Sequence, residues 1–231
     1  MAIRPEYRDK PIRSYVVRSG RMTKSQKDAF GSKWKRYGLR LDDGKVDLDD
    51  VFQRSAKKVL EIGFGMGDSL LQMAMQEPET DFLGIEVHAP GMGSLVNAAA
   101  DQDIDNLRLY LADANDVLEE CIAPDSLDRV QLYFPDPWHK KKHHKRRIVQ
   151  PQFLQLIRRK LKVKGCLHIA TDWEPYAEQM LELIDAAPGY KNTAGKGHFI
   201  PRPDYRPLTK FEKRGQGLGH GVWDLLAEKT H

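Results

Sequence analysis

Four acidic side chains stand where apolar segments of the sequence end, at Glu61, Glu86, Asp113 and Asp136. Acids gathered along one rim repel one another, and a bound ligand that carries positive charge and amino groups relieves that repulsion. A carboxylate at the end of a strand also accepts hydrogen bonds from the hydroxyls of a ribose. The spacing of these acids therefore predicts a site for a cationic, amine-bearing cofactor.

The last of these acids lies in a proline-rich joint, Phe134-Pro-Asp-Pro-Trp138, which follows an apolar run. Prolines end a strand abruptly because they cannot donate to its hydrogen-bond ladder. Directly after the joint, the sequence carries six cations: Lys140, Lys141, Lys142, Lys145, Arg146 and Arg147. An acid joined to a dense cationic loop predicts chemistry beside a bound polyanion such as nucleic acid. Trp138 is either a stacking surface for a base or a core side chain under the loop.

A glycine turn, Glu61-Ile-Gly-Phe-Gly-Met-Gly67, follows the first apolar segment. A dinucleotide fingerprint needs a third glycine where Asp68 stands, so this sequence matches that fingerprint poorly. The turn resembles instead the first motif of S-adenosylmethionine-dependent methyltransferases, although a plain strand–helix turn also uses glycines. The residues that we expect to bind a cofactor are Glu61, Gly63, Gly65, Glu86, Asp113, Ala114 and Asp136. Asp113 is equally suited to cap a helix.

The elements that must position these residues alternate along the chain. Five segments predict strands, at residues 58–62, 81–87, 107–112, 130–134 and 165–170. Helical patterns separate them, at residues 68–76, 93–100 and 114–121 and after Pro151 and Pro175. This alternation implies an α/β fold with a doubly wound, mostly parallel sheet covered by helices on both faces. Ligands of such sheets bind beyond the carboxyl ends of the strands, where the four acids would meet.

Length and composition fit one core with an appended arm. The chain has 231 residues, 40% of them hydrophobic, and a net charge of +4. Residues 1–50 are rich in cations, glycine and proline, so we expect a basic, partly disordered arm and linker before a domain over residues 51–231. Within the arm, residues 24–37 predict a short helix, with Ser25 as a possible cap.

Several function classes are not expected. No apolar run has the length of a membrane span, and no signal-peptide core follows Met1. Cys121 and Cys166 lack disulfide or metal spacing, and the histidines of the cationic loop lack metal geometry. We therefore expect a cytoplasmic protein without a metal; the sequence leaves monomer and homodimer open.

Longer motifs resemble one family. The joint and cationic loop together resemble the P-D-P-W-x-K-x-x-H-x-K-R-R block of bacterial tRNA (guanine-N7)-methyltransferases. Five further motifs follow the same order along the chain as in that family: E-I-G-F-G-M-G (61–67), G-I-E-V (84–87), A-D-A (112–114), A-T-D-W (170–173) and T-K-F-E (209–212). The resemblance covers residues 57–231. It implies a Rossmann-like class I methyltransferase with a seven-stranded sheet whose last strand, near residues 221–227, is antiparallel. It also implies methylation of N7 of guanine 46 in the tRNA variable loop, with S-adenosylmethionine as cofactor.

The resemblance assigns roles to particular residues. It gives Asp136 the catalytic position, where the carboxylate holds the edge of the target base. It nominates as substrate contacts Lys140, Asp172, Thr209, Lys210, Phe211 and Glu212. It makes a loop that contacts RNA from Lys142, His143, His144, Lys145, Arg146 and Arg147. Asp172 has an alternative role as the N-cap of the helix near Pro175.

Three other functions fit part of the sequence. A nicotinamide-dependent oxidoreductase would use Glu86 for its ribose but leaves the cationic loop unexplained. A non-catalytic RNA-binding protein would not need the acids at the strand ends. An amino methyltransferase that acts on adenine or cytosine is the nearest enzymatic alternative, since its (Asp/Asn)-Pro-Pro-aromatic motif is similar to the joint around Asp136.

Overall fold

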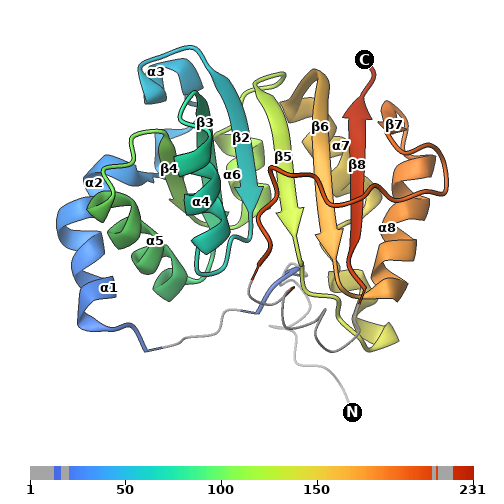
Figure 1. The fold of residues 1–231 in the computed structure, drawn as a ribbon, viewed down its shortest axis with the longest axis horizontal. Helices are drawn as coiled ribbons and strands as arrows, with labels where there is room; N and C mark the ends of the chain where they lie inside the picture. The colour runs from blue at the N-terminus through green and yellow to red at the C-terminus, as the bar shows by residue number, and fades with distance from the viewer. Residues whose placement is uncertain (1–12, 17–20, 210–211, 213–220) are drawn as a thin grey trace, which may run out of the picture.

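One mixed sheet organises the part of the chain that the computed structural model describes, which is residues 13–16, 21–209, 212 and 221–231 (Figure 1). Its eight strands follow the order β1-β4-β3-β2-β5-β6-β8-β7. All pairs from β1 to β6 are parallel, and β8 is antiparallel to both of its neighbours. The predicted α/β fold with an antiparallel last strand is confirmed. The sheet has one strand more than expected, because β1 spans two residues and is too short to leave a pattern.

The bounds of the elements agree closely with the predicted alternation. The strands are β1 (Gly38–Leu39), β2 (Lys57–Ile62), β3 (Thr80–Glu86), β4 (Leu107–Leu111), β5 (Leu127–Tyr133), β6 (Leu161–Thr171), β7 (Tyr190–Asn192) and β8 (Trp223–Lys229). The helices are α1 (Lys24–Asp28), η2 (Ala29–Lys33), α2 (Trp34–Tyr37), η3 (Leu41–Asp43), α3 (Leu48–Phe52), α4 (Asp68–Gln76), α5 (Ala89–Asp101), α6 (Ala114–Glu120), η4 (Lys141–Arg146), α7 (Pro151–Lys160) and α8 (Glu174–Ala186). None of the helices in these described ranges is long and apolar enough to cross a membrane.

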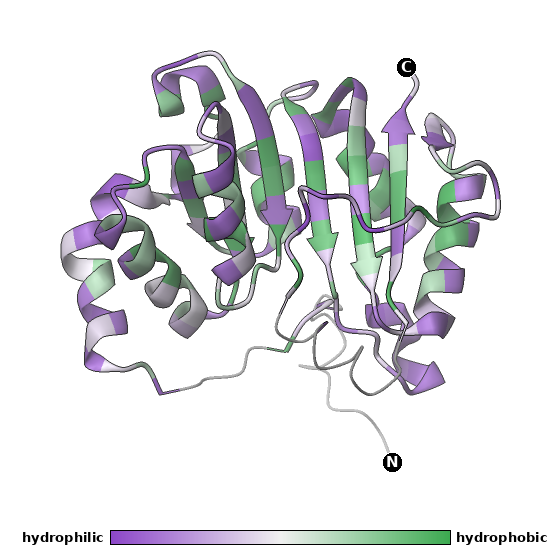
Figure 2. Cartoon of the chain, viewed as in Figure 1, coloured by the Kyte–Doolittle hydropathy of each residue, from purple (hydrophilic) through white to green (hydrophobic). Residues whose placement is uncertain are grey.

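The sheet separates two hydrophobic cores. Successive residues of a strand point to opposite faces, so Val59 packs with α4 and α5 while Leu60 packs with α6, α7 and α8. Figure 1 shows α4 and α5 in front of the sheet and α6 and α7 behind it. Figure 2 shows hydrophobic residues along the central strands and hydrophilic ones on the outer helices. From β2 the chain continues to β3 on one side, and β5 pairs on the other, so the switch point lies between β2 and β5.

The described part of residues 1–50 differs from the expected arm and linker. Thr23 and Gln26 form a capping box at the start of α1, so Thr23 rather than Ser25 is the cap. The Gln26 side chain donates to Ser94 of α5 over 2.9 Å, and β1 extends the sheet beside β4. Leu48 and Phe52 of α3 lie in a core. Residues 21–50 therefore belong to the folded domain, and residues 1–12 and 17–20 lie outside the described residues.

An irregular segment with buried polar side chains covers the front face of β5, β6 and β8. The segment from residue 193 to 209 crosses β8, β6 and β5 in Figure 1. It buries Arg206 completely, and the guanidinium donates to both oxygens of Glu212 and both of Asp224 over 2.7–2.8 Å. Asp224 also lies 2.8 Å from Nε2 of the buried His168. Burial lowers the pKa of His168, so the ring stays neutral and its Nε2–H donates to Asp224.

Candidate active site

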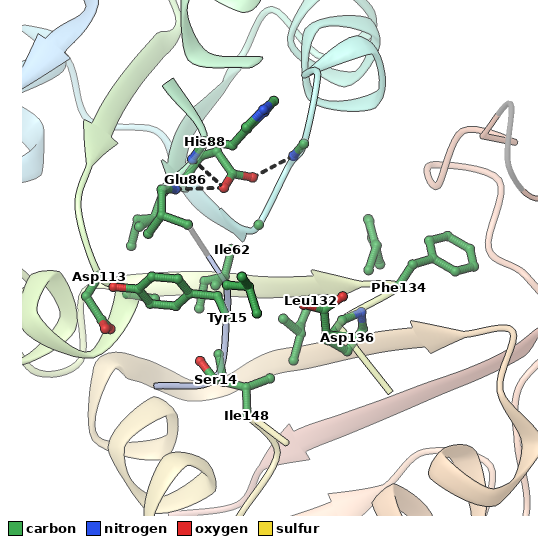
Figure 3. A pocket seen from close by; sticks show the side chains of 18 of the residues that line it. Ser14, Tyr15, Ile62, Glu86, His88, Asp113, Leu132, Phe134, Asp136 and Ile148 are labelled. Carbon is green, nitrogen blue, oxygen red and sulfur yellow. Dashed lines mark hydrogen bonds between the residues drawn. The ribbon is translucent and has the colours of Figure 1, made fainter. Parts of the chain in front are cut away.

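A cavity of about 540 Å³ opens at the carboxyl ends of β2, β3, β4 and β5 (Figure 3). It lies at the switch point, where the topology predicts a ligand site. Ile62, Ile85 and Leu132 give it an apolar floor. Its rim carries the acids Glu86, Asp113 and Asp136, so three of the four acids singled out from the sequence share this cavity.

The glycine turn forms the wall next to β2 and is held by Glu86. The backbone of Gly65 has a φ of +61°, and the space where its side chain would stand is open to the cavity. The carboxylate of Glu86 accepts from the backbone N–H of Gly65 over 2.8 Å, and from those of Val87 and His88 over 2.7 and 3.0 Å. A carboxylate offers about four lone pairs, so these three bonds leave room for one more donor. Glu86 therefore shapes the turn as well as facing the ligand.

The start of α5 supports the same turn and was missed in the sequence. A side chain at Gly91 would stand 1.9 Å from the carbonyl oxygen of Gly65, so only glycine permits this approach. The Nδ1 atom of His88 accepts from the N–H of Gly91 over 3.3 Å and caps the helix. Both residues follow the predicted strand directly, but neither fits a known phosphate or metal spacing. Their role becomes visible only once α5 is packed against the turn.

Asp113 combines the two roles that the sequence left open. Its carboxylate accepts from the N–H of Asn115 over 2.9 Å, which makes it the N-cap of α6. The same side chain lines the cavity together with Ala112 and Ala114. Tyr15 lies beside it, with its hydroxyl directed at the carboxylate (Figure 3). Asp113 is therefore held in a fixed orientation at the edge of the cavity.

The joint around Asp136 has an unusual backbone. Phe134 and Trp138, which flank the Pro-Asp-Pro sequence, have φ angles of +51° and +47°. A left-handed backbone at a residue other than glycine costs about 1–3 kcal/mol and persists only where the surroundings enforce it. The N–H of Phe134 donates to Ala170 on β6 over 2.8 Å, and the indole Nε1–H of Trp138 donates to the Ser14 carbonyl over 3.2 Å. These contacts hold Asp136 exposed at the mouth of the cavity.

Glu61 lies behind the cavity rather than on its rim. Its side chain is 3% exposed, and its Oε2 atom has no hydrogen-bond partner among the residues that the structure describes. Burial, reinforced by the charge of Glu86, raises the pKa of Glu61 to about 8, and Arg129 offsets part of this rise. A direct contact with a bound cofactor was expected of Glu61, and the structure instead gives it a place beneath the lining.

The cationic loop divides into exposed and buried members. Lys140, which was expected to touch substrate, is exposed, and so are the lysines that follow it: Lys141, Lys142 and Lys145. Partial burial and the positive charges of Lys142 and Arg146 lower the pKa of His143, which shows that the loop carries a positive field. The guanidinium of Arg146 lies over the Trp138 ring, with 5.0 Å between the Arg146 Cζ and the ring centroid.

Arg147 departs from the predicted contact with RNA. It is 3% exposed and lies over the ring of Tyr176. Its guanidinium donates to the Pro137 carbonyl over 2.9 Å and to Gln179, and its Nη2 lies 3.2 Å from Nε2 of His144. A planar fork of donors can bind several acceptors at once, and here all of them belong to the protein. Arg147 therefore braces the joint from inside.

Of the remaining predicted substrate contacts, the described ones, Asp172, Thr209 and Glu212, lie outside the lining of the cavity. Asp172 is exposed, and Trp173 rather than Asp172 occupies the N-cap position of α8. The Glu212 carboxylate is buried against Arg206, and its N–H donates to the Thr209 hydroxyl over 3.1 Å. The predicted contacts Lys210 and Phe211 fall outside the described residues. Glu212 is therefore turned into the protein and not open to a substrate, because it neutralises a buried guanidinium.

Comparison with known proteins gives a consistent picture. The family described as "Putative methyltransferase" matches residues 55–225. A tRNA (guanine-N(7)-)-methyltransferase of Saccharophagus degradans is 59% identical over 99% of this chain and 100% of its own length. The enzyme of the same name from Stutzerimonas stutzeri is 59% identical over 94% of this chain and 92% of its own.

Solved structures share the fold at much lower identity. The 16S rRNA methyltransferase KamB superposes with a TM-score of 0.59 at 15% identity, over 80% of this chain and 93% of its own. A 16S rRNA (adenine(1408)-N(1))-methyltransferase of Catenulisporales acidiphilia, solved with its cosubstrate, gives a TM-score of 0.55 at 19% identity, over 80% and 92% of the two chains. Together with the near full-length relatives, the matched family establishes the relationship. The chain belongs to the tRNA (guanine-N(7)-)-methyltransferase family.

Proposed function

We propose that this protein transfers a methyl group from S-adenosylmethionine to N7 of guanine 46 in the variable loop of tRNA. The observation that carries the proposal is the shared position of the acid-rimmed cavity and the exposed cationic loop, joined through Asp136. The names of the relatives support tRNA as the substrate and guanine N7 as the accepting atom. The resemblance of the motifs supports position 46. A tRNA substrate also puts the protein in the cytoplasm.

The cavity fits S-adenosylmethionine in size and chemistry. Its apolar floor suits a purine, and its rim offers Asp113 and Glu86 to the polar groups of an adenosine. The open side of Gly65 lets the backbone approach the ligand, and the acids on the rim favour a positively charged one. When bound, this cofactor supplies a methyl group activated by a sulfonium.

The accepting atom makes modest demands on the protein. Guanine N7 carries an in-plane lone pair at neutral pH, so no proton has to be removed before the methyl group is transferred. Positive charge then develops on the guanine ring, and a fixed carboxylate beside the ring stabilises it. The protein therefore mainly has to orient the base, which an exposed acid on a stiff joint does well. We assign this role to Asp136.

The cationic loop serves the RNA side of the same reaction. A base held in a folded RNA must be drawn out before it reaches the cavity, at a cost of about a few kcal/mol. Exposed lysines next to Asp136 contact backbone phosphates and offset that cost. His143, His144 and Arg146, at the edge of the same loop, are placed to follow the RNA backbone, and Asp172 is exposed on the neighbouring loop after β6. Lys140, Asp172 and Thr209 stay our proposed substrate contacts.

The direct test is to map the methylated nucleoside. The purified protein is incubated with unmodified tRNA transcript and S-adenosylmethionine, and the digested RNA is analysed by mass spectrometry. We expect 7-methylguanosine at position 46 and its loss when guanine 46 is replaced by adenine. Methylated adenine or cytosine in place of 7-methylguanosine would favour the amino methyltransferase alternative.

Replacing the proposed base-positioning acid separates chemistry from cofactor binding. Asp136→Ala should lower the turnover number about 100-fold or more, the size found when one stabilising group is removed. Its affinity for S-adenosylmethionine should change by less than about threefold, because Asp113 and Glu86 remain. Glu79→Ala, an exposed acid at the amino end of β3, serves as the control and should leave both quantities unchanged. Equal losses of turnover and cofactor affinity in Asp136→Ala would contradict the assignment.

A further inference from the structure

The N-terminal segment from Ser14 to Val16 lines the cavity although it lies far from the glycine turn in the sequence. No motif of the family resemblance includes these residues, since the resemblance starts near residue 57. In Figure 3 the ring of Tyr15 lies between the Asp113 side of the cavity and the residues at the end of β5. The segment therefore adds a wall that the strand ends alone do not provide.

Two contacts fix this wall at opposite sides. On one side, the Tyr15 hydroxyl faces the Asp113 carboxylate, and burial followed by the charge of Asp113 raises the pKa of the tyrosine. The hydroxyl therefore keeps its proton and turns it toward Asp113. On the other side, the indole Nε1–H of Trp138 donates to the Ser14 carbonyl over 3.2 Å. The segment thus spans from the joint around Asp136 to the cap of α6.

We infer that Tyr15 is a cofactor-binding residue, and that Trp138 positions it through the Ser14 carbonyl. The inference rests on the proposed function, because the ligand is taken to be S-adenosylmethionine. An aromatic ring beside an apolar floor gives an adenine a second surface to pack on. The hydroxyl keeps Asp113 aligned toward the polar edge of that base, with Asn115 holding the other side of the carboxylate.

Trp138 links this wall to the RNA-facing loop. The Arg146 Cζ lies 5.0 Å from the centroid of its ring. The ring of His143 also contacts it, with 5.9 Å between the two ring centroids. The indole N–H of Trp138 reaches back to Ser14. One side chain therefore contacts both the cationic loop and the wall of the cavity, so its effect on the cofactor should pass through Tyr15.

Calorimetric titration of the full-length protein with S-adenosylmethionine, without tRNA, tests both halves of the inference. Tyr15→Ala should weaken binding about tenfold or more, the loss expected for a stacked aromatic ring. Tyr15→Phe keeps the ring and should weaken binding about two- to fivefold, because Asp113 loses the hydroxyl that faces it. Wild-type affinity in Tyr15→Ala would overturn the inference. If the wild-type protein itself fails to bind S-adenosylmethionine, the proposed function falls and this inference with it.

A double-mutant cycle tests the role of Trp138. Trp138→Phe keeps an aromatic ring and loses the donor to Ser14, and should weaken cofactor binding about threefold in the wild-type background. In the Tyr15→Ala background it should have no further effect. An equal loss in both backgrounds would overturn the positioning role. Trp173→Phe, an exposed indole on the neighbouring loop, is the matched control, and thermal unfolding without ligand verifies that each variant is folded. If Tyr15→Ala fails to fold, Tyr15→Leu replaces it in the cycle, with the same expected and overturning results.

Discussion

Two regions of this protein are rich in lysine and arginine, but they use their charges in opposite ways. In the N-terminal helices, Lys33 pairs with Asp101 over 2.9 Å, and Arg36 pairs with the two acids of the loop that follows α5. In the loop of residues 140–147, no lysine forms an ion pair with any acid in the described residues. In the first region, Lys33 and Arg36 tie the N-terminal helices to α5 and the loop after it, whereas the lysines of the second region are exposed to solvent.

The difference shows what a count of charges omits. Sequence counts place twelve cations in residues 1–40 and six in the loop, and both sets predict contact with a polyanion. The acids that pair with Lys33 and Arg36 lie more than sixty residues away along the chain, at the end of α5 and in the loop after it. Only the fold brings them together. The loop keeps its field because no acidic element packs on it among the described residues, and the lowered pKa of His143 reflects that field.

The largest effect is expected from replacing Arg147, the buried member of the loop. Arg147→Met should lower the free energy of unfolding by about 2–4 kcal/mol, because it removes a buried guanidinium that donates to the Pro137 carbonyl and to Gln179. The measurement is urea-induced unfolding followed by circular dichroism. Lys145→Met is the matched control, since it removes the same charge from an exposed position and should cost less than about 0.5 kcal/mol. If both variants lose the same stability, Arg147 does not brace the joint.

A second experiment compares the two regions directly by removing three charges from each. If the proposed function holds, replacing Lys140, Lys141 and Lys142 by glutamine should weaken tRNA binding about 10- to 100-fold at low salt. The slope of the logarithm of the binding constant against the logarithm of the salt concentration should fall in magnitude by about 1–3 units. The matched triple variant replaces Lys33, Arg36 and Arg40, whose partners are Asp101, Asp103, Asp105 and Asp42. It should leave the slope nearly unchanged. Equal changes of slope would mean that the paired cations also bind RNA.

The fold was largely predictable because its signal is local. Apolar runs that alternate with helical patterns gave the strands β2 to β6, and Pro151 begins α7 as predicted. The acids at the strand ends needed only the rule that parallel strands end at one edge of a sheet. Three of the four acids line the cavity for this reason, whereas Glu61 is buried and is not among the lining residues.

The parts that were missed depend on contacts between distant segments. Glu212 is turned inward because it pairs with Arg206. Arg147 is turned inward because it donates to the Pro137 carbonyl and to Gln179. Both are charged residues that the sequence suggested would be exposed. Tyr15 reaches the cavity from a segment whose composition suggests only a basic arm. Periodicity carries no information on such pairings, because each depends on which surface packs against which.

The buried acid Glu61 extends the comparison to an acid that pairs with no cation among the described residues, and it predicts a pH effect. Burial raises its pKa from the ordinary 4.5 to about 8, so between these values the folded protein keeps a proton that the unfolded chain has lost. Stability from this group is therefore present at low pH and is lost as pH rises through that window, by up to about 1.4 kcal/mol per pH unit. Glu61→Gln carries an amide that is uncharged at every pH, and so removes this dependence. The difference in unfolding free energy between the variant and the wild type should grow in favour of the variant from pH 5.5 to 7.5. His168 titrates alike in both proteins, so the difference isolates Glu61, whereas parallel pH profiles would show that Glu61 finds a partner in solution.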